Sequence, residues 1–126
     1  MNTVPGNGQH ECVVIPSSSD EEFTASMYAL VPKLRAGLVV LGRGPVSPAL
    51  ARDAQQALRS ERVTLVWLAQ PQPTEFHLGI PDGLAEDELE AVYASLEAAL
   101  PELLHRDVRV TVAPLPQVLA LSLSGR

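Results

Sequence analysis

The fold is decided by residues 38–68, LVVLGRGPVSPALARDAQQALRSERVTLVWL. Two apolar runs, Leu38–Leu41 and Val63–Leu68, enclose a glycine-containing turn and a stretch whose apolar residues recur at helical spacing. A third apolar run begins at Val13, so the three runs start 25 residues apart. Strand-like runs that alternate with helix-like stretches are typical of consecutive βα units. The sequence therefore predicts an α/β domain whose first three strands are parallel.

The helix-like stretches carry their own boundary signals. The first spans about 20–34, and Pro32 is expected to kink or end it because proline lacks the backbone N–H of a helix interior. The second spans about 48–59, with Ser47 as its N-cap and Pro48 at the first helical position. The third spans about 85–100 and carries its apolar residues on one face.

The later strands differ from the first three. Residues Glu75–Ile80 alternate between apolar and polar side chains, and the loop that precedes them is too short for a helix, so this strand should pair antiparallel with its predecessor. Val108–Val112 should form a strand with its valines inward, and Val118–Leu123 a final short strand at the sheet edge. The predicted order is β-α-β-α-β-β-α-β-β in one mixed sheet.

The length of 126 residues suits one domain. Residues 1–11 contain Gly, Pro and Asn, so we expect a flexible N-terminal tail before a single domain over residues 12–126. The chain has no run of roughly 18 apolar residues and no basic, apolar start of the kind that marks a secretory signal. We therefore expect no membrane span and a cytoplasmic location.

Charge and cysteine content exclude several classes of function. The formal net charge is −6, and a nucleic-acid partner is not expected because phosphate binding needs clustered Lys and Arg. Cys12 is the only cysteine, which excludes an internal disulfide and a thiolate metal cage. The three histidines are scattered without metal-ligand spacing, so we expect no metal and no other cofactor.

The loop after the second strand is the best candidate for an anion-binding site. It joins a buried strand to a helix N-terminus, whose free backbone N–H groups can hold a phosphate or a carboxylate. The second helix has no acid in its first turn, unlike the first helix, which starts with three acidic residues. The candidate ligands are Gly42, Arg43, Gly44, Ser47 and Arg52.

Two other interpretations stay open. The same loop fits a plain turn followed by an N-cap, because its spacing matches neither the dinucleotide fingerprint nor the Walker loop. Glu75 and His77 share one face of the fourth strand and form a second candidate site, in which the carboxylate would orient the imidazole. An exposed strand histidine without a function is the alternative.

The sequence supports two hypotheses about function. No combination of nucleophile, base and orienting group is visible, so the first hypothesis is a non-catalytic binding or regulatory module. This module would form a homodimer through the apolar edge of the last strand, made by Val118, Leu119, Leu121 and Leu123. The second hypothesis is a small enzyme or ligand binder for an anionic metabolite at residues 42–47.

Overall fold

The computed structural model describes residues 11–124. The predicted tail, apart from Glu11, lies outside these residues. The elements follow in the order β1 (Cys12–Pro16), α1 (Asp20–Leu30), η2 (Val31–Lys33), β2 (Val39–Arg43), α2 (Pro48–Ser60), β3 (Thr64–Gln72), β4 (Glu75–Ile80), α3 (Glu86–Ala99), η3 (Pro101–Leu104), β5 (Arg109–Pro114) and α4 (Leu115–Ser124).

The five strands form one mixed sheet in the order β1-β2-β3-β4-β5. β1, β2 and β3 are parallel, with Val13 beside Val40 and Val40 beside Leu65. β4 pairs antiparallel with β3, and β5 pairs parallel with β4. The predicted α/β class, mixed sheet and three parallel strands are therefore confirmed.

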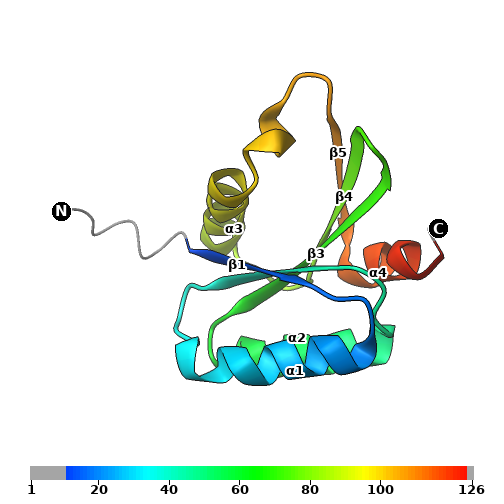
Figure 1. The fold of residues 1–126 in the computed structure, drawn as a ribbon. Helices are drawn as coiled ribbons and strands as arrows, with labels where there is room; N and C mark the ends of the chain where they lie inside the picture. The colour runs from blue at the N-terminus through cyan, green and yellow to red at the C-terminus, as the bar shows by residue number, and fades with distance from the viewer. Residues whose placement is uncertain (1–10, 125–126) are drawn as a thin grey trace.

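Helices cover both faces of the sheet, and strand direction decides which face each crossover helix takes (Figure 1). Crossovers between parallel strands are right-handed. The chain moves across the sheet in one direction throughout, but β4 and β5 point opposite to β1–β3. The crossover helix α3 therefore lies on the face opposite to α1 and α2.

Each face has its own apolar core. On one face, α1, α2 and α4 pack on β1–β3, and Phe23 of α1 meets Trp67 of β3 edge to face with ring centroids 5.5 Å apart. On the other face, Val92 and Leu96 of α3 pack on side chains that include Leu41. Both faces of the central strands are covered, which explains why Leu38–Leu41 is apolar at every position.

The predicted last strand is wrong, because residues 115–124 form helix α4. Val118 and Leu119 are buried against the sheet on the α1–α2 side, so they offer no strand edge to a second copy. The physical reason is that α1 and α2 leave β3 and β4 partly uncovered on this face. Gly79 has no side chain there, and Leu115 and Val118 come close enough to fill the space.

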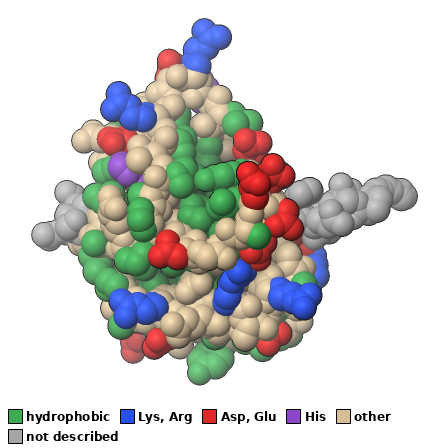
Figure 2. All heavy atoms as spheres, turned by 180° about the vertical axis from the view of Figure 1, so that it is seen from behind, with side chains coloured by type: hydrophobic (Ala, Val, Ile, Leu, Met, Phe, Trp, Pro, Cys, Tyr) green, Lys and Arg blue, Asp and Glu red, His purple; other side chains and the backbone are tan. Residues whose placement is uncertain are grey.

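The inward valines predicted for the β5 segment are also wrong in part. Val110 and Val112 remain 37% and 48% exposed, because β5 lies at the edge of the sheet and no helix covers its outer part. From behind, acidic side chains gather over α3 beside an apolar area of the surface (Figure 2). The α3 side of the sheet is therefore less completely covered than the α1–α2 side.

Both ends of helix α1 have a local cause in the sequence. Its N-cap is Ser19, whose hydroxyl accepts a hydrogen bond from the backbone N–H of Glu22 at 3.1 Å. The α-helix stops at Leu30, and Pro32 lies in the short 3-10 turn that follows. None of the helices within residues 11–124 has the length and apolar character that a membrane crossing needs.

Candidate functional site

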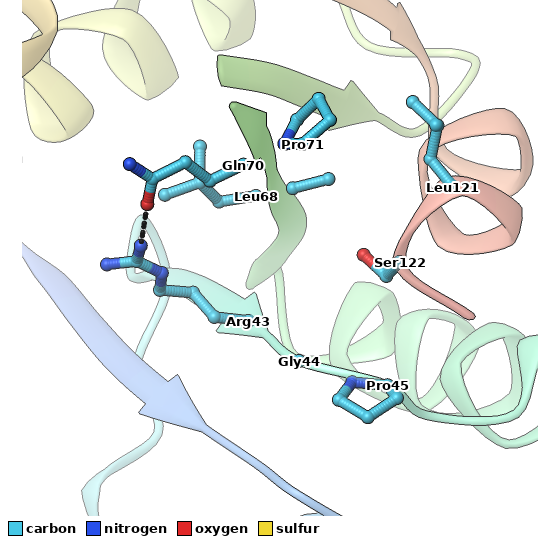
Figure 3. A pocket seen from close by; sticks show the side chains of 9 residues that line it. Arg43, Gly44, Pro45, Leu68, Gln70, Pro71, Leu121 and Ser122 are labelled. Atoms are coloured by element: carbon cyan, nitrogen blue, oxygen red, sulfur yellow. Dashed lines mark hydrogen bonds between the residues drawn. The ribbon is translucent and has the colours of Figure 1, made fainter. Parts of the chain in front are cut away.

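A cavity of about 240 Å³ lies where β2 ends and β3 continues past it toward the hairpin (Figure 3). Arg43 is the last residue of β2 and pairs with Leu68, whereas β3 extends to Gln72. The carboxyl ends of parallel strands are the usual position for ligands in α/β sheets. The cavity is lined by Arg43, Gly44, Pro45, Leu68, Ala69, Gln70, Pro71, Leu121 and Ser122.

Close packing explains both glycines of the loop. A Cβ atom on Gly42 would overlap the ring of Trp67, and one on Gly44 would overlap the carbonyl oxygen of Ser17. Gly44 also has a φ of +103°, which favours glycine. Trp67 fixes the loop further, since its indole N–H donates to the carbonyl oxygen of Gly44 at 3.2 Å. The two glycines therefore shape the loop by letting its neighbours approach.

The N-terminus of α2 already has an anionic partner from within the protein. The backbone N–H of Ser47 donates to the Oδ1 atom of Asp20, the first residue of α1, at 2.8 Å. The Ser47 hydroxyl makes no capping hydrogen bond. A carboxylate at a helix N-terminus is favoured by the helix dipole. An external anion would therefore compete with Asp20 at this point, and Arg43 is the better candidate ligand.

The guanidinium group of Arg43, a residue that lines the cavity, is held by one side chain. Its Nη2 atom donates to Oε1 of Gln70 at 3.1 Å, and Gln70 in turn donates from Nε2 to the carbonyl oxygen of Pro73 at 3.1 Å. The turn between β3 and β4 thus orients the amide. Arg43 makes no ion pair with a carboxylate of residues 11–124, so its charge and its other donors are free for a ligand.

Ser122 of α4 supplies a second polar group to the lining of the cavity. Its Oγ atom is buried and has no hydrogen-bond partner in the described part of the chain. Figure 3 shows this hydroxyl pointing from α4 toward β3, whereas the side chains of Arg43 and Gln70 meet on the other side of the β3 ribbon; all three residues contribute to the lining of the cavity. A buried hydroxyl without a partner is costly, which makes it a suitable contact for a bound polar molecule.

Sequence reasoning missed Ser122 and Gln70. Ser122 follows Leu115, Val118 and Leu119 at helical spacing, which would have placed all four on one face of a helix. The same segment also fits the two-residue alternation of a strand, with Leu119, Leu121 and Leu123 on one face, and this second pattern hides the helical one. Gln70 had no signal in the sequence, since its role depends on the turn that brings it beside Arg43.

The structure separates Arg52 from the other candidate anion ligands. Its exposed side chain lines a different cavity, formed with Pro48, Pro81, Asp82 and residues at the start of α4. Arg43 and Gly44 share the cavity at the end of β2, whereas Arg52 contributes nothing to it.

The second candidate pair does form a contact. The Nε2 atom of His77 lies 3.0 Å from Oε2 of Glu75, and both side chains are partly buried. His77 is the register partner of Ala69, which lines the cavity, but His77 itself is not part of the lining. The pair therefore lies beside the site on the neighbouring strand.

Cys12 and the acidic residues do not add a second reactive site. Burial raises the pKa of the Cys12 thiol to about 11, which disfavours the nucleophilic thiolate. Among the residues that the structure describes, no three His, Cys, Asp or Glu side chains lie together in a group that could hold a metal ion.

Comparisons with known proteins do not extend this description. No protein-family model matches the chain, and no curated protein matches it in sequence. The functional assignment therefore rests on the geometry of the cavity.

Proposed function

We propose that this protein binds a small molecule with an anionic group in the cavity between the end of β2, β3 and the last turns of α4. Arg43 would contact the anionic group, and Ser122 would form a hydrogen bond to a polar atom elsewhere on the same ligand. The observation that carries the proposal is that one cavity is lined by two polar residues with unused hydrogen-bonding capacity. Within residues 11–124, the guanidinium group of Arg43 has no carboxylate partner and the buried hydroxyl of Ser122 has no hydrogen-bond partner.

The chemistry of the lining supports a specific rather than a general attraction. The protein is acidic, so an anion is repelled by most of the surface and needs a local positive group. The apolar walls, which include Leu68 and Leu121, exclude water and strengthen a charged hydrogen bond to Arg43. Such a bond contributes about 1.5–3 kcal/mol.

A thermal-shift and calorimetry experiment tests the proposal. Inorganic phosphate, sulfate, acetate, citrate and glycerol 3-phosphate serve as probes. At least one should raise the melting temperature of the wild type. Arg43→Gln should weaken its binding by about tenfold or more, because a charge-assisted bond is lost. Arg52→Gln is the matched control and should leave the affinity unchanged. The proposal is wrong if no probe binds, or if both variants lose the same affinity.

Ser122→Ala tests the second polar contact. It should weaken binding of a probe with two polar groups, such as glycerol 3-phosphate, by about fivefold to tenfold, since one neutral hydrogen bond is lost. Binding of inorganic phosphate, which has no polar group beyond the phosphate itself, should change less. Equal affinities of Ser122→Ala and the wild type for every probe would leave Ser122 outside the site.

We also propose self-association, through β5 rather than through the C-terminal segment. The N–H of Arg109 donates to Thr74 beside β4, so alternate residues of β5 face β4 and the backbone groups of Val110 and Val112 point away from the sheet. Two copies of β5 can pair antiparallel about Thr111. Val110 then lies opposite Val112 of the second copy, which hides both exposed valines.

Light scattering with the full chain tests this second proposal. The wild type should show twice the monomer mass at about 100 μM, and Val112→Lys should reduce it to the monomer mass because a charged edge disfavours strand pairing. Leu123→Lys is the control, since Leu123 is exposed on α4 and lies outside β5. A monomeric wild type at this concentration contradicts the proposal.

A further inference from the structure

A second concave surface lies between α1 and α2, away from the cavity at the end of β2. Its volume is about 270 Å³, and buried Phe23 and Leu58 form its floor. Met27 and Leu50 form its sides. A neighbouring hollow near the start of both helices shares Thr24, Tyr28 and Leu50 with it, so the two form one continuous surface, which we call the α1–α2 groove.

The rim of the α1–α2 groove carries apolar side chains that are exposed to solvent. Tyr28 is 76% exposed and Val31 is 57% exposed, and both lie on its rim. Surface helices normally place polar residues at such positions. Contiguous apolar side chains of this kind mark interaction surfaces more often than isolated exposed ones do.

The charged groups around the α1–α2 groove have one sign. Asp53 lines the main cavity, and Asp20 and Glu21 line the neighbouring hollow. Asp20 is used by the N–H of Ser47, but Glu21 and Asp53 make no ion pair within residues 11–124. No Lys or Arg of the described chain lines either part.

We propose that the α1–α2 groove is the docking site for a basic amphipathic helix of a partner protein. The apolar face of that helix would bury Tyr28, Val31 and Leu50, and its Lys or Arg residues would meet Glu21 and Asp53. A second copy of this chain is a poor occupant in a two-fold contact, since that contact would bring the same carboxylates together. An anionic membrane surface would be repelled for the same reason.

The dimensions of the α1–α2 groove favour a helix as the occupant. α1 has 11 residues and is therefore about 16 Å long. A partner helix of about three turns would cover this length and present apolar side chains at i, i+3 or i+4 and i+7. A third helix packed over two neighbouring helices places its ridge of side chains in the groove between them.

Fluorescence anisotropy with a designed peptide tests this proposal. The probe is a fluorescein-labelled, 14-residue amphipathic helix of Leu and Lys, and the comparison peptide replaces every Lys by Glu. The full chain should bind the Leu/Lys peptide with micromolar affinity and should bind the Leu/Glu peptide at least tenfold more weakly. Both Tyr28→Ala and Asp53→Lys should weaken binding of the Leu/Lys peptide at least fivefold.

A charge control distinguishes docking from general attraction between an acidic protein and a basic peptide. Glu90→Lys makes the same charge change on the exposed face of α3, on the opposite side of the sheet. It should change the affinity less than twofold. Tyr28 and Asp53 are exposed, so their variants should remain folded, which circular dichroism checks. If Glu90→Lys weakens binding as much as Asp53→Lys, or if the wild type does not bind the peptide, the proposal is wrong.

Discussion

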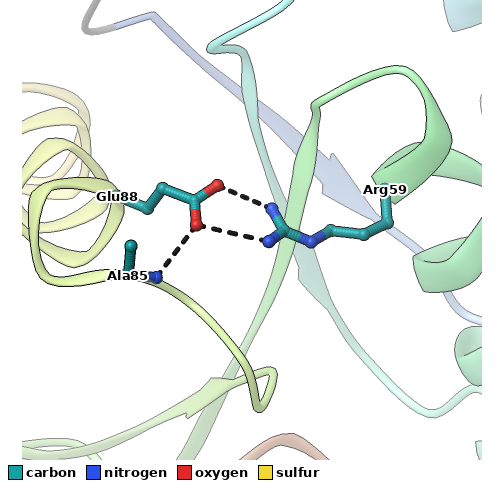
Figure 4. Close-up of polar contacts among 3 residues, drawn as sticks. All are labelled: Arg59, Ala85 and Glu88. Atoms are coloured by element: carbon teal, nitrogen blue, oxygen red, sulfur yellow. Dashed lines mark hydrogen bonds and ion pairs between the residues drawn. The ribbon is translucent and has the colours of Figure 1, made fainter.

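Arg59 near the end of α2 and Glu88 in the first turn of α3 form a two-point ion pair that joins the helical layers on opposite faces of the sheet (Figure 4). Nη1 and Nη2 of Arg59 donate to the two carboxylate oxygens at 2.8 and 3.2 Å. Glu88 also accepts the backbone N–H of Ala85 at 2.9 Å, which caps a helix whose N-cap residue has no side-chain acceptor. One carboxylate therefore links two helices and completes the start of α3.

This pair predicts a specific acid sensitivity. The hydrogen bonds from Arg59 and from the N–H of Ala85 lower the pKa of Glu88 to about 2 from an ordinary value of 4.5. A lowered pKa adds stability that is present above pH 4.5 and is lost as the pH falls toward 2. The side chains of Arg59 and Glu88 are both about one-third exposed, so the pair should contribute less than about 1 kcal/mol to the free energy of unfolding.

Urea denaturation of Glu88→Gln measures this effect. The wild type should be more stable than the variant at pH 6, and the difference should shrink between pH 4.5 and pH 2. Glu90→Gln, at an exposed carboxylate on the same helix, is the control and should show no such pH dependence. A difference that stays constant down to pH 2 would contradict the assignment.

Arg62→Gly should stabilise the protein. Arg62 has a φ of +61° at the end of α2, where Val63 N–H donates to Leu58 and Arg62 N–H donates to Arg59. This pattern is a Schellman motif, which usually has glycine at the left-handed position. Relief of the strain should exceed the added entropy of the unfolded chain, giving about 0.5–1 kcal/mol. Arg62→Ala keeps the strain, so equal urea midpoints for the two variants would contradict this reasoning.

Two serines beside α1 should respond to alanine in opposite ways. The hydroxyl of Ser17 is buried without a partner in the described chain, so Ser17→Ala should be neutral or stabilising by up to about 1 kcal/mol. Ser19→Ala removes the N-cap bond to Glu22 and should cost about 1 kcal/mol. Thermal denaturation of both variants checks the prediction, and the reverse order of melting temperatures would overturn it.

Alanine substitutions at Gly44 and Gly83 distinguish the destabilisation caused by steric overlap from the destabilisation caused by a positive φ. Both glycines have positive φ, but an added Cβ overlaps Ser17 only at Gly44, and nothing lies within 4 Å of the one at Gly83. Gly83→Ala should therefore cost about 1 kcal/mol, and Gly44→Ala about 3 kcal/mol or more. Chemical denaturation measures both, and equal losses would show that the loop can move away from Ser17.

Cys12 should react slowly in the folded protein. Its pKa of about 11 leaves little thiolate at pH 8, and the thiolate is the reactive form. Ellman's reagent should therefore label Cys12 at least tenfold more slowly in the folded chain than in concentrated urea. Equal rates would mean that the thiol is more exposed to solvent than the structure indicates.

Local patterns were sufficient for most of the fold. Leu38–Leu41 is apolar at every position because both faces of that strand are covered, and the short connection before Glu75 permits only an antiparallel return. The end of α1 before Pro32 follows from the missing proline N–H, and the start of α2 at Pro48 follows from the preference of proline for the first helical position. These signals act over a few residues, so the chain carries them before any tertiary contact forms.

The C-terminal segment could not be assigned in this way. Leu119, Leu121 and Leu123 alternate as in a strand, whereas Leu115, Val118, Leu119 and Ser122 recur as in a helix. The tertiary structure favours the helix, because the surface left open beside Gly79 accepts a helix face and β5 already forms the edge of the sheet. A pattern that fits two periods is resolved only by the surface on which it packs.

The cavity at the end of β2 shows the same division. Arg43 and Gly44 were recognisable because a loop between a buried strand and a helix is a local feature. Gln70 and Ser122 come from a hairpin and from a helix far along the chain, and only the packing of α4 on β3 brings Ser122 to the cavity that Arg43 also lines. Strand and helix content thus follows from short-range periodicity, whereas the composition of the cavity depends on long-range contacts that periodicity does not encode.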